Sequence, residues 1–287
     1  MKKLAGPNIT FSDALREVYS GISCDIERAR YANAIPDADE IEEQYCIGAN
    51  NANLFEFPRV TSTRDDPDPA VRNGLRKSDL TKLYTQFFVP QKKPGRLIYD
   101  RIKVSAKGKC PFCGGVGQVR TLDHYLPKAN FPLVSVLPAN LIPSCGDCNF
   151  DKSNHFPYQR NKQTLNPYYD SDHFFVQQWI FARVVPSSPV VLDFFVDPPA
   201  GWSEEDRERV VAHFQDYDLA ERFAIEAAAD LPETITTRRT TLSALTPGEF
   251  SEHLTEKARN QALPVNNWRR VMFLALSQDE WFCSREF

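Results

Sequence analysis

The chain has 287 residues, of which 42% are hydrophobic and 25% are charged, and its formal net charge is −4. This length suits one or two domains, and the composition excludes a chain that is intrinsically disordered throughout. No apolar run approaches the roughly 18 residues of a membrane-spanning helix. The two lysines near the start are not followed by the apolar core of a secretory signal. We therefore expect a cytoplasmic protein with no membrane partner.

Residues 1–74 are expected to form a helical region that ends in a linker. Residues 10–34 and 37–47 have helical patterns, and Thr10 or Ser12 can cap the first of them. Residues 57–74 are rich in proline, aspartate and threonine, which predicts a loop. Between positions 13 and 56, ten acidic residues stand against three basic ones, so this region is strongly acidic.

A strongly basic stretch follows the acidic region. One helix is predicted to begin at Ser78, and a second follows Pro94. Between positions 92 and 128, nine basic residues stand against two acidic ones, which gives a net charge of +7. Such a strip is either a solvated face or a surface that binds phosphates, and charge alone leaves both interpretations open.

Seven cysteines are present, and an odd number argues against a disulfide framework. Four of them form two Cys-x-x-Cys pairs, Cys110 with Cys113 and Cys145 with Cys148. Each pair can turn both thiolates toward one point, and two pairs supply the four sulfurs of a closed tetrahedral zinc site. A redox motif would account for one pair but not for two. We therefore predict a structural Zn²⁺ held by these four residues.

The segment between the two cysteine pairs has 31 residues, which exceeds the roughly 15–20 of a simple zinc ribbon, so a further element is expected there. Residues 118–124 alternate like a strand and end in Asp123-His124. Residues 131–136 form a second apolar segment, which predicts the second strand, and residues 149–152 open a helix. This order predicts a small ββα unit with the zinc site at its base.

Residues 166–287 predict a mainly helical C-terminal region with one short strand segment. The strand is expected at 190–196, and amphipathic helices are expected at 203–230, 247–262 and 266–282. The sequence shows no internal repeat, no low-complexity tract and no glycine loop of the kind that cradles phosphates. The chain therefore carries no visible ATPase motif of its own.

The segment between the cysteine pairs, together with those pairs, resembles the HNH endonuclease family. The resemblance rests on Asp123-His124, Asn140-Leu141 and a Cys-x-x-Cys-Asn-x-x-Lys run that ends at Lys152, in this order within residues 110–155. It points to the variant of the family in which the third residue of the HNH motif is Asn and four cysteines lie at the base of the ββα module. It implies an α+β fold, mostly helical, with helical extensions around a central ββα-metal HNH module that contains structural zinc. That module, with its leading basic helices, is expected at 75–165.

The chemistry of phosphodiester hydrolysis assigns roles to these residues. The reaction needs a base for the attacking water and a cation for the phosphate oxygens. His124, with a reference pKa of about 6.5, is the candidate base. Asp123 offers a hard oxygen ligand to a catalytic Mg²⁺ or Mn²⁺, and Asn149 offers a second, neutral oxygen. In the family pattern, Asn140 braces the loop that carries the histidine.

Two lysines complete the predicted site. Lys128 follows the Asp-His pair closely, and Lys152 lies one helical turn beyond Asn149, so both are candidate contacts to substrate phosphate. Each residue alone has a simpler explanation: the Asp-His pair as a surface pair, Asn140 as a turn residue and Asn149 as a helix cap. Their joint occurrence inside the cysteine frame favours the catalytic interpretation.

We therefore predict a metal-dependent endonuclease that hydrolyses phosphodiester bonds in DNA. The long flanks are also similar to nucleases of Septu-type anti-phage systems, which implies a role in bacterial defence beside an ATPase partner. Two alternatives remain. One is a zinc-stapled module that binds nucleic acid without catalysis, and the other is a toxin-like nuclease that cleaves RNA.

Overall fold

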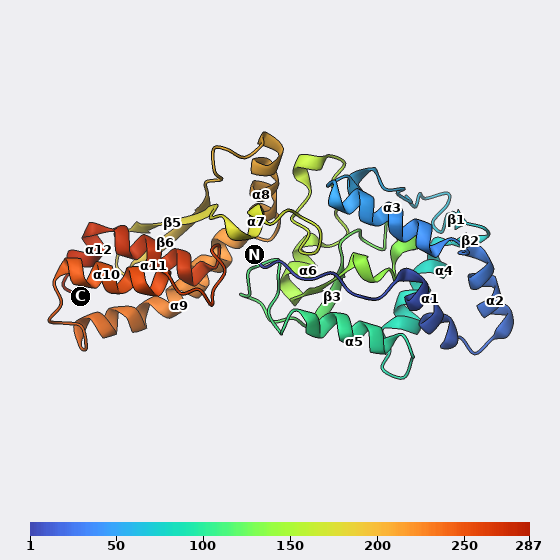
Figure 1. Cartoon of the computed structure of the whole chain (residues 1–287), viewed down its shortest axis with the longest axis horizontal. Coiled ribbons are helices and arrows are strands. Elements are labelled where there is room, and N and C mark those ends of the chain that lie inside the picture. The colour runs from blue at the N-terminus through green and yellow to red at the C-terminus, as the bar shows by residue number, and fades with distance from the viewer. The chain divides into compact units, whose positions relative to one another are not determined.

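The structure is a computed structural model that describes all residues from 1 to 287. Twelve α-helices and three two-stranded antiparallel sheets make up the fold, so the predicted class, α+β and mostly helical, is confirmed (Figure 1). No helix combines the length and the apolar character that crossing a membrane requires. The chain forms two compact units. The N-terminal unit comprises Leu4–Pro111 and Gly117–Asp170, and the C-terminal unit comprises Met1–Lys3, Phe112–Val116 and Ser171–Phe287.

Three helices open the N-terminal unit: α1 (Phe11–Ser20), α2 (Asp25–Ala34) and α3 (Ala38–Asn50). The Thr10 hydroxyl accepts a hydrogen bond of 3.1 Å from the Asp13 N–H, so Thr10 caps α1 as the sequence predicted. The prediction of one helix over 10–34 is wrong. The chain turns at Gly21, whose N–H bonds to carbonyls of the last turn of α1, and α2 begins only at Asp25.

The predicted linker ends in a small hairpin. Strands β1 (Ala70–Arg72) and β2 (Leu75–Arg76) pair antiparallel across Asn73 and Gly74. Both turn residues have positive φ, 43° and 81°, and a two-residue turn between right-twisted strands favours this conformation. The Asn-Gly dipeptide is the sequence signal for this turn. Residues 70–74, predicted as part of a loop, therefore form a strand and a tight turn.

Two helical segments precede the first cysteine pair. Helix α4 (Lys77–Lys82) continues directly into a π-helix (Leu83–Phe88), so the helix predicted from Ser78 exists with wider turns in its second half. Helix α5 (Arg96–Ser105) follows as predicted. Between them, a Cβ on Gly95 would come within 2.8 Å of the Phe87 carbonyl oxygen. Only glycine fits this close approach of the two segments.

The segment between the cysteine pairs forms a hairpin and a helix. Strand β3 (Thr121–His124) pairs antiparallel with β4 (Leu141–Ser144), with Asp123 opposite Ile142, and α6 (Gly146–Lys152) follows. The second strand is therefore not at 131–136, as predicted. That segment holds a 3₁₀-helix (Pro132–Val134), because Pro132 cannot donate a ladder hydrogen bond and its fixed φ suits a first helical position. A ββα order is nonetheless present.

The C-terminal unit joins a long hairpin to five helices that follow it. Strand β6 (Val191–Val196) lies where a strand was predicted, and its partner β5 (Ile180–Val185) was not predicted. The predicted helix at 203–230 is two helices, because Asp218 adopts a left-handed conformation with φ 46°. The helices of this unit are α7 (His173–Val176), α8 (Glu204–Asp216), α9 (Leu219–Arg239), α10 (Pro247–Ala258), α11 (Trp268–Gln278) and α12 (Glu280–Ser284).

Candidate functional site

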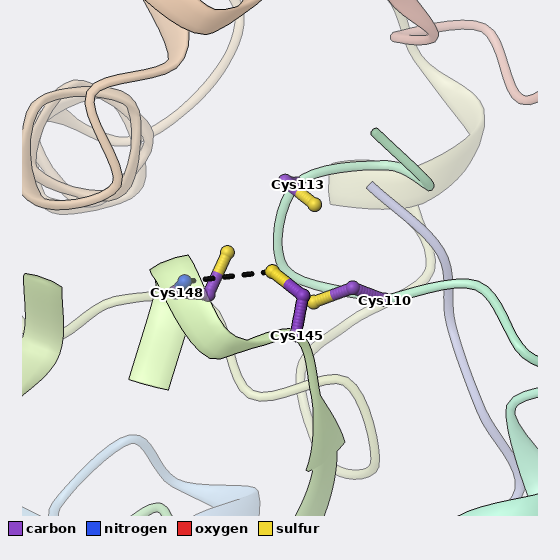
Figure 2. Close-up of side chains that lie close together, drawn as sticks. All are labelled: Cys110, Cys113, Cys145 and Cys148. Atoms are coloured by element: carbon purple, nitrogen blue, oxygen red, sulfur yellow. Dashed lines mark hydrogen bonds between the residues drawn. The ribbon is translucent and has the colours of Figure 1, made fainter. Parts of the chain in front are cut away.

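The four cysteines of the two pairs form one cluster. All four are buried, and their Sγ atoms lie within 4.8 Å of one another (Figure 2). The Cys148 N–H lies 3.4 Å from the Cys145 Sγ, the local bond that folds the second pair around its own sulfur. Gly114 and Gly115 have φ of 64° and 94°, which allows the tight turn after Cys113. The predicted convergence of the four thiol groups is confirmed, and the cluster can hold a metal ion.

The sulfur spacing is compatible with a tetrahedral ligand set. Four thiolates at a metal–sulfur distance of about 2.3 Å would lie about 3.8 Å apart. The observed limit of 4.8 Å on the distances between the sulfurs is about 1 Å larger than this value. All four donors are soft sulfurs, so they favour a thiophilic ion over Mg²⁺ or Mn²⁺.

A separate polar hollow of about 250 Å³ lies in the N-terminal unit. Successive strand residues face opposite sides, yet both Asp123 and His124 line this hollow because β3 ends at His124 and the chain bends there. Asn149 joins them from α6. The full lining is Asp123, His124, Pro127, Lys128, Asn149, Phe150, Ser153 and Asn154. The structure thus brings together four of the predicted site residues.

His124 is held in one orientation and one tautomer. Its Nε2 lies 2.8 Å from the Ser135 carbonyl oxygen, which can only accept, so Nε2 carries the proton and Nδ1 is left as a basic nitrogen. The ring also packs edge-on against Tyr84, with 4.4 Å between ring centroids. Burial, reinforced by the charge of Lys128, lowers the pKa of His124 to about 3. The pKa of His124 therefore lies well below the reference value of about 6.5, and the imidazole is neutral across the physiological range.

Asp123 forms a buried ion pair. Its side chain is 5% exposed, and its Oδ2 lies 2.9 Å from the ammonium of Lys152, whose side chain is 4% exposed. Burial raises the pKa of the Asp123 carboxyl, and the Lys152 charge opposes that rise. Although the ammonium is close, Oδ2 has no hydrogen bond of good geometry. Oδ2 is itself inaccessible to solvent, so it is the carboxylate oxygen that faces Lys152.

The prediction that Lys152 contacts substrate phosphate is not what the structure shows. Its ammonium donates to the His124 carbonyl oxygen and pairs with Asp123, and the side chain is nearly inaccessible. Lys152 thus holds the end of β3 against α6. Lys128 is half-buried and lines the hollow, with its ammonium 5.6 Å from the centre of the Tyr84 ring. Of the two lysines, only Lys128 is placed to meet a phosphate in the hollow.

Asn140 is fully buried and uses both ends of its amide. Its Oδ1 accepts from the Leu126 N–H at 2.7 Å and from the Tyr45 hydroxyl at 3.0 Å. Its Nδ2 donates to the carbonyl oxygens of Leu126 and Val134, at 3.1 Å and 3.2 Å. Val134 precedes Ser135, whose carbonyl orients His124. Asn140 therefore ties the two sides of the loop behind the histidine, the geometry that a bracing role requires.

Asn149 lies inside α6 rather than at its start. The N-cap of α6 is Cys145, so the interpretation of Asn149 as a cap is excluded. The side chain is half-buried and lines the hollow beside Asp123. An amide and a carboxylate thus face the same space, and their oxygens suit a hard divalent cation.

The chain is similar over almost its whole length to a protein of a bacteriophage. It is 35% identical over 294 residues to Protein ea31 of Escherichia phage lambda, an alignment that covers 98% of this chain and 99% of the phage protein. The chain belongs to the Protein ea31 family. No family model matches the sequence, and no solved structure matches it.

Three further residues of this region were not singled out from the sequence. Ser135 acts through its main-chain carbonyl, which no side-chain pattern signals. Tyr84, whose ring contacts His124, lies in the helical segment predicted from Ser78, and nothing in that pattern marks it as a neighbour of the histidine. Phe150 is 81% exposed at the rim of the hollow. A large aromatic directly after Asn149, in an otherwise polar turn, was the available signal for it.

Proposed function

We propose that the protein is a metal-dependent endonuclease of the HNH type that hydrolyses phosphodiester bonds in DNA. The observation that carries the proposal is the convergence of His124, Asp123 and Asn149 on one polar hollow, with His124 in the tautomer that presents a basic nitrogen. A base and two oxygen ligands beside one space are the groups that hydrolysis of a phosphodiester needs.

In this mechanism His124 acts as the general base. Nδ1 takes a proton from the attacking water, while the bond from Nε2–H to the Ser135 carbonyl keeps the ring fixed. When Nδ1 gains the proton, the ring becomes a positively charged imidazolium. The Ser135 carbonyl oxygen stabilises this charge, because it accepts the hydrogen bond from Nε2–H. A bound phosphodiester adds a negative charge near the ring and so raises the low pKa of His124 toward a useful range. Asn140 acts indirectly, by holding the loop that ends at Ser135.

The residues of the hollow fit a catalytic Mg²⁺ or Mn²⁺. Asp123 and Asn149 would hold the ion, since both line the hollow and offer hard oxygens. When bound, the ion would supply positive charge to the phosphate oxygens. The Lys152 charge opposes the rise in the Asp123 pKa that burial causes, and so favours the ionised carboxylate that a cation would bind.

The four-cysteine cluster is proposed to hold a structural Zn²⁺. Four thiolates close the tetrahedral shell of zinc and leave no position for water or substrate. Cys145 is also the N-cap of α6, the helix that carries Asn149 and Lys152. A zinc ion on Cys145 and Cys148 would therefore fix the start of the helix on which the hollow depends.

The basic sequence between 92 and 128 supports a nucleic-acid substrate. Lys92, Arg101 and Lys107 on and beside α5 are exposed, as are Lys109 and Arg120. Lysine and arginine side chains in water can neutralise backbone phosphates. DNA is the proposed substrate. An anti-phage role beside an ATPase partner extends the proposal on the Septu-type resemblance, and co-purification from cells would test that extension.

A nicking assay with metal analysis on the same sample tests the proposal. Brief chelation with EDTA should abolish nicking of supercoiled plasmid while about one zinc per chain remains bound, because four buried thiolates release zinc slowly. Added Mg²⁺ or Mn²⁺ should restore nicking without added zinc. Recovery only with zinc would show that the oxygen site is not the catalytic one. DNA binding without nicking under any metal would favour the non-catalytic module, and cutting of RNA alone would favour the toxin-like nuclease.

The Cys145→Ser variant should be tested in the same nicking assay with metal analysis. It should lose the zinc and the activity together, because a structural zinc contributes folding free energy directly. Cys24→Ser is the matched control, since Cys24 is exposed and lies outside the cluster. A Cys145→Ser protein with full zinc content would refute the four-cysteine assignment.

A further inference from the structure

An aromatic side chain stands in solvent at the rim of the polar hollow. Phe150 is 81% exposed, although a buried phenylalanine is usually among the strongest contributors to a core. Single exposed apolar residues are common on protein surfaces, so exposure alone carries no meaning. Its position is what distinguishes Phe150, because the residue directly follows Asn149 and lines the same hollow as Asp123 and His124.

We propose that Phe150 stacks on an unpaired base next to the scissile phosphate, and that the enzyme therefore prefers single-stranded or locally unpaired DNA. The proposal rests on the proposed nuclease function, since it concerns the strand that would lie in that hollow. It assigns to Phe150 the selection of the substrate's structure, separate from the chemistry of His124.

The composition of the hollow supports this arrangement. Lys128 lines the same hollow as Phe150 and offers a positive charge for a backbone phosphate, beside the polar groups of Asp123 and Asn149. A nucleotide presents the same two features, a charged phosphate and a flat apolar base attached through the sugar. Aromatic side chains beside a basic groove are the usual means of holding single strands, and stacking tolerates any base because every base has a π-face.

The form of DNA follows from which base faces are accessible. Inside a regular duplex, both faces of each base are covered by neighbouring pairs, so an exposed ring has nothing to stack on without unstacking a step. In a single strand, a bubble or a flap, one face is open. Phe150 would therefore add affinity only for unpaired DNA, whereas Lys128 would contribute to both forms through phosphate.

The first test measures binding with a protein that cannot consume its ligand. In a His124→Gln background with Mg²⁺, Phe150→Ala should weaken binding of a fluorescein-labelled single strand by about 5- to 150-fold, the range expected for loss of one stacked base. Binding of the same sequence as a perfect duplex should change less than about 2-fold, and Phe150→Trp should retain single-strand affinity. Fluorescence anisotropy gives all of these values.

The second test measures cutting by the protein with an intact His124. Its rate on a duplex with a central mismatched bubble should exceed the rate on the matched duplex, and Phe150→Ala should remove that preference. Ile26→Ala is the matched control, because Ile26 is 83% exposed and does not line the hollow. It should leave both rates unchanged.

The outcomes separate the two proposals. Equal loss of single-strand and duplex binding, or no loss in Phe150→Ala, overturns the stacking role even if the enzyme cuts DNA. If instead single-strand binding depends on Phe150 but no metal supports cutting, the nuclease function fails while the base contact stands. Absence of any single-strand binding by the parent protein overturns the inference directly.

Discussion

Two buried histidines, one in each unit, differ in what surrounds them. His124 and His213 are 5% and 1% exposed, and each points Nε2 at a main-chain carbonyl oxygen 2.8 Å away, that of Ser135 and of Phe112. Burial lowers the pKa of both to about 3. His213 packs against the rings of Phe112, Tyr217 and Trp179, whereas His124 lines a hollow with Asp123 and Asn149.

A fixed tautomer and a lowered pKa are therefore not sufficient to identify a histidine as a catalytic base. Both histidines share these properties, which follow from burial and one hydrogen bond. What differs is access to a polar space and the presence of oxygen ligands beside it. The environment of His213 is that of a core residue, and the environment of His124 is that of a site.

The largest expected effect comes from replacing each histidine by glutamine. Glutamine keeps an N–H donor for the carbonyl but has no basic nitrogen. His124→Gln should therefore fold and bind DNA but nick it about 10² to 10⁴ times more slowly, the usual loss for a general base. His213→Gln should nick at the parent rate per folded molecule. Comparable nicking rates for the parent protein and His124→Gln in a plasmid assay would show that His124 is not the general base.

The ion pair beside His124 should matter most for stability. Lys152→Met leaves Asp123 as a buried charge without its partner, which typically costs about 3–5 kcal/mol. The matched control is Lys128→Met, since Lys128 is half-buried and lines the hollow, and its effect on unfolding should be below about 1 kcal/mol. Urea unfolding followed by circular dichroism measures both. An equally small effect at both positions would show that Lys152 is not a buried partner in solution.

Acid should destabilise the C-terminal unit through His213. The folded state holds the pKa of His213 at about 3 and the unfolded state at about 6.5, so the unfolded chain takes up a proton between these values and the folded chain does not. The contribution of neutral His213 to the free energy of unfolding is therefore fully present above about pH 6.5. It falls as the pH drops, by about 2 kcal/mol between pH 7 and pH 5.

Tryptophan fluorescence can isolate this effect. All four tryptophans lie in the C-terminal unit, at positions 179, 202, 268 and 281, so their emission follows the unfolding of that unit. His213→Gln should reduce the acid sensitivity by the same amount. An unchanged slope with pH in that variant would show that another group controls it.

The smallest expected effect on stability is at Asn149. The residue is inside α6 and does not cap it, so Asn149→Ala should change unfolding by less than about 1 kcal/mol, in the stabilising direction because alanine favours helix. The same change removes one oxygen from the hollow and should raise the Mg²⁺ concentration that half-maximal nicking requires. A Mg²⁺ titration of both proteins checks this, and identical curves would remove Asn149 from the metal site.

The sequence alone determined the features that depend on neighbouring residues. Each Cys-x-x-Cys pair brings two sulfurs together within one turn, so the cluster could be predicted from spacing. The cap at Thr10 and the helix after Pro94 follow from the same short-range chemistry. The mostly helical α+β class also followed, because periodicity over a long segment outweighs errors at its ends.

The features that join distant residues could not be predicted from the sequence, because they depend on tertiary contacts. The partner strand of β3 is β4 rather than residues 131–136, because pairing depends on the path of the whole loop. Lys152 turns inward to Asp123, 29 positions away, which no helical spacing reveals. The tautomer of His124 depends on the carbonyl of Ser135, a group that every residue possesses. Burial then sets its pKa far below the reference value, since the cost of losing water around a charge depends on everything packed around it.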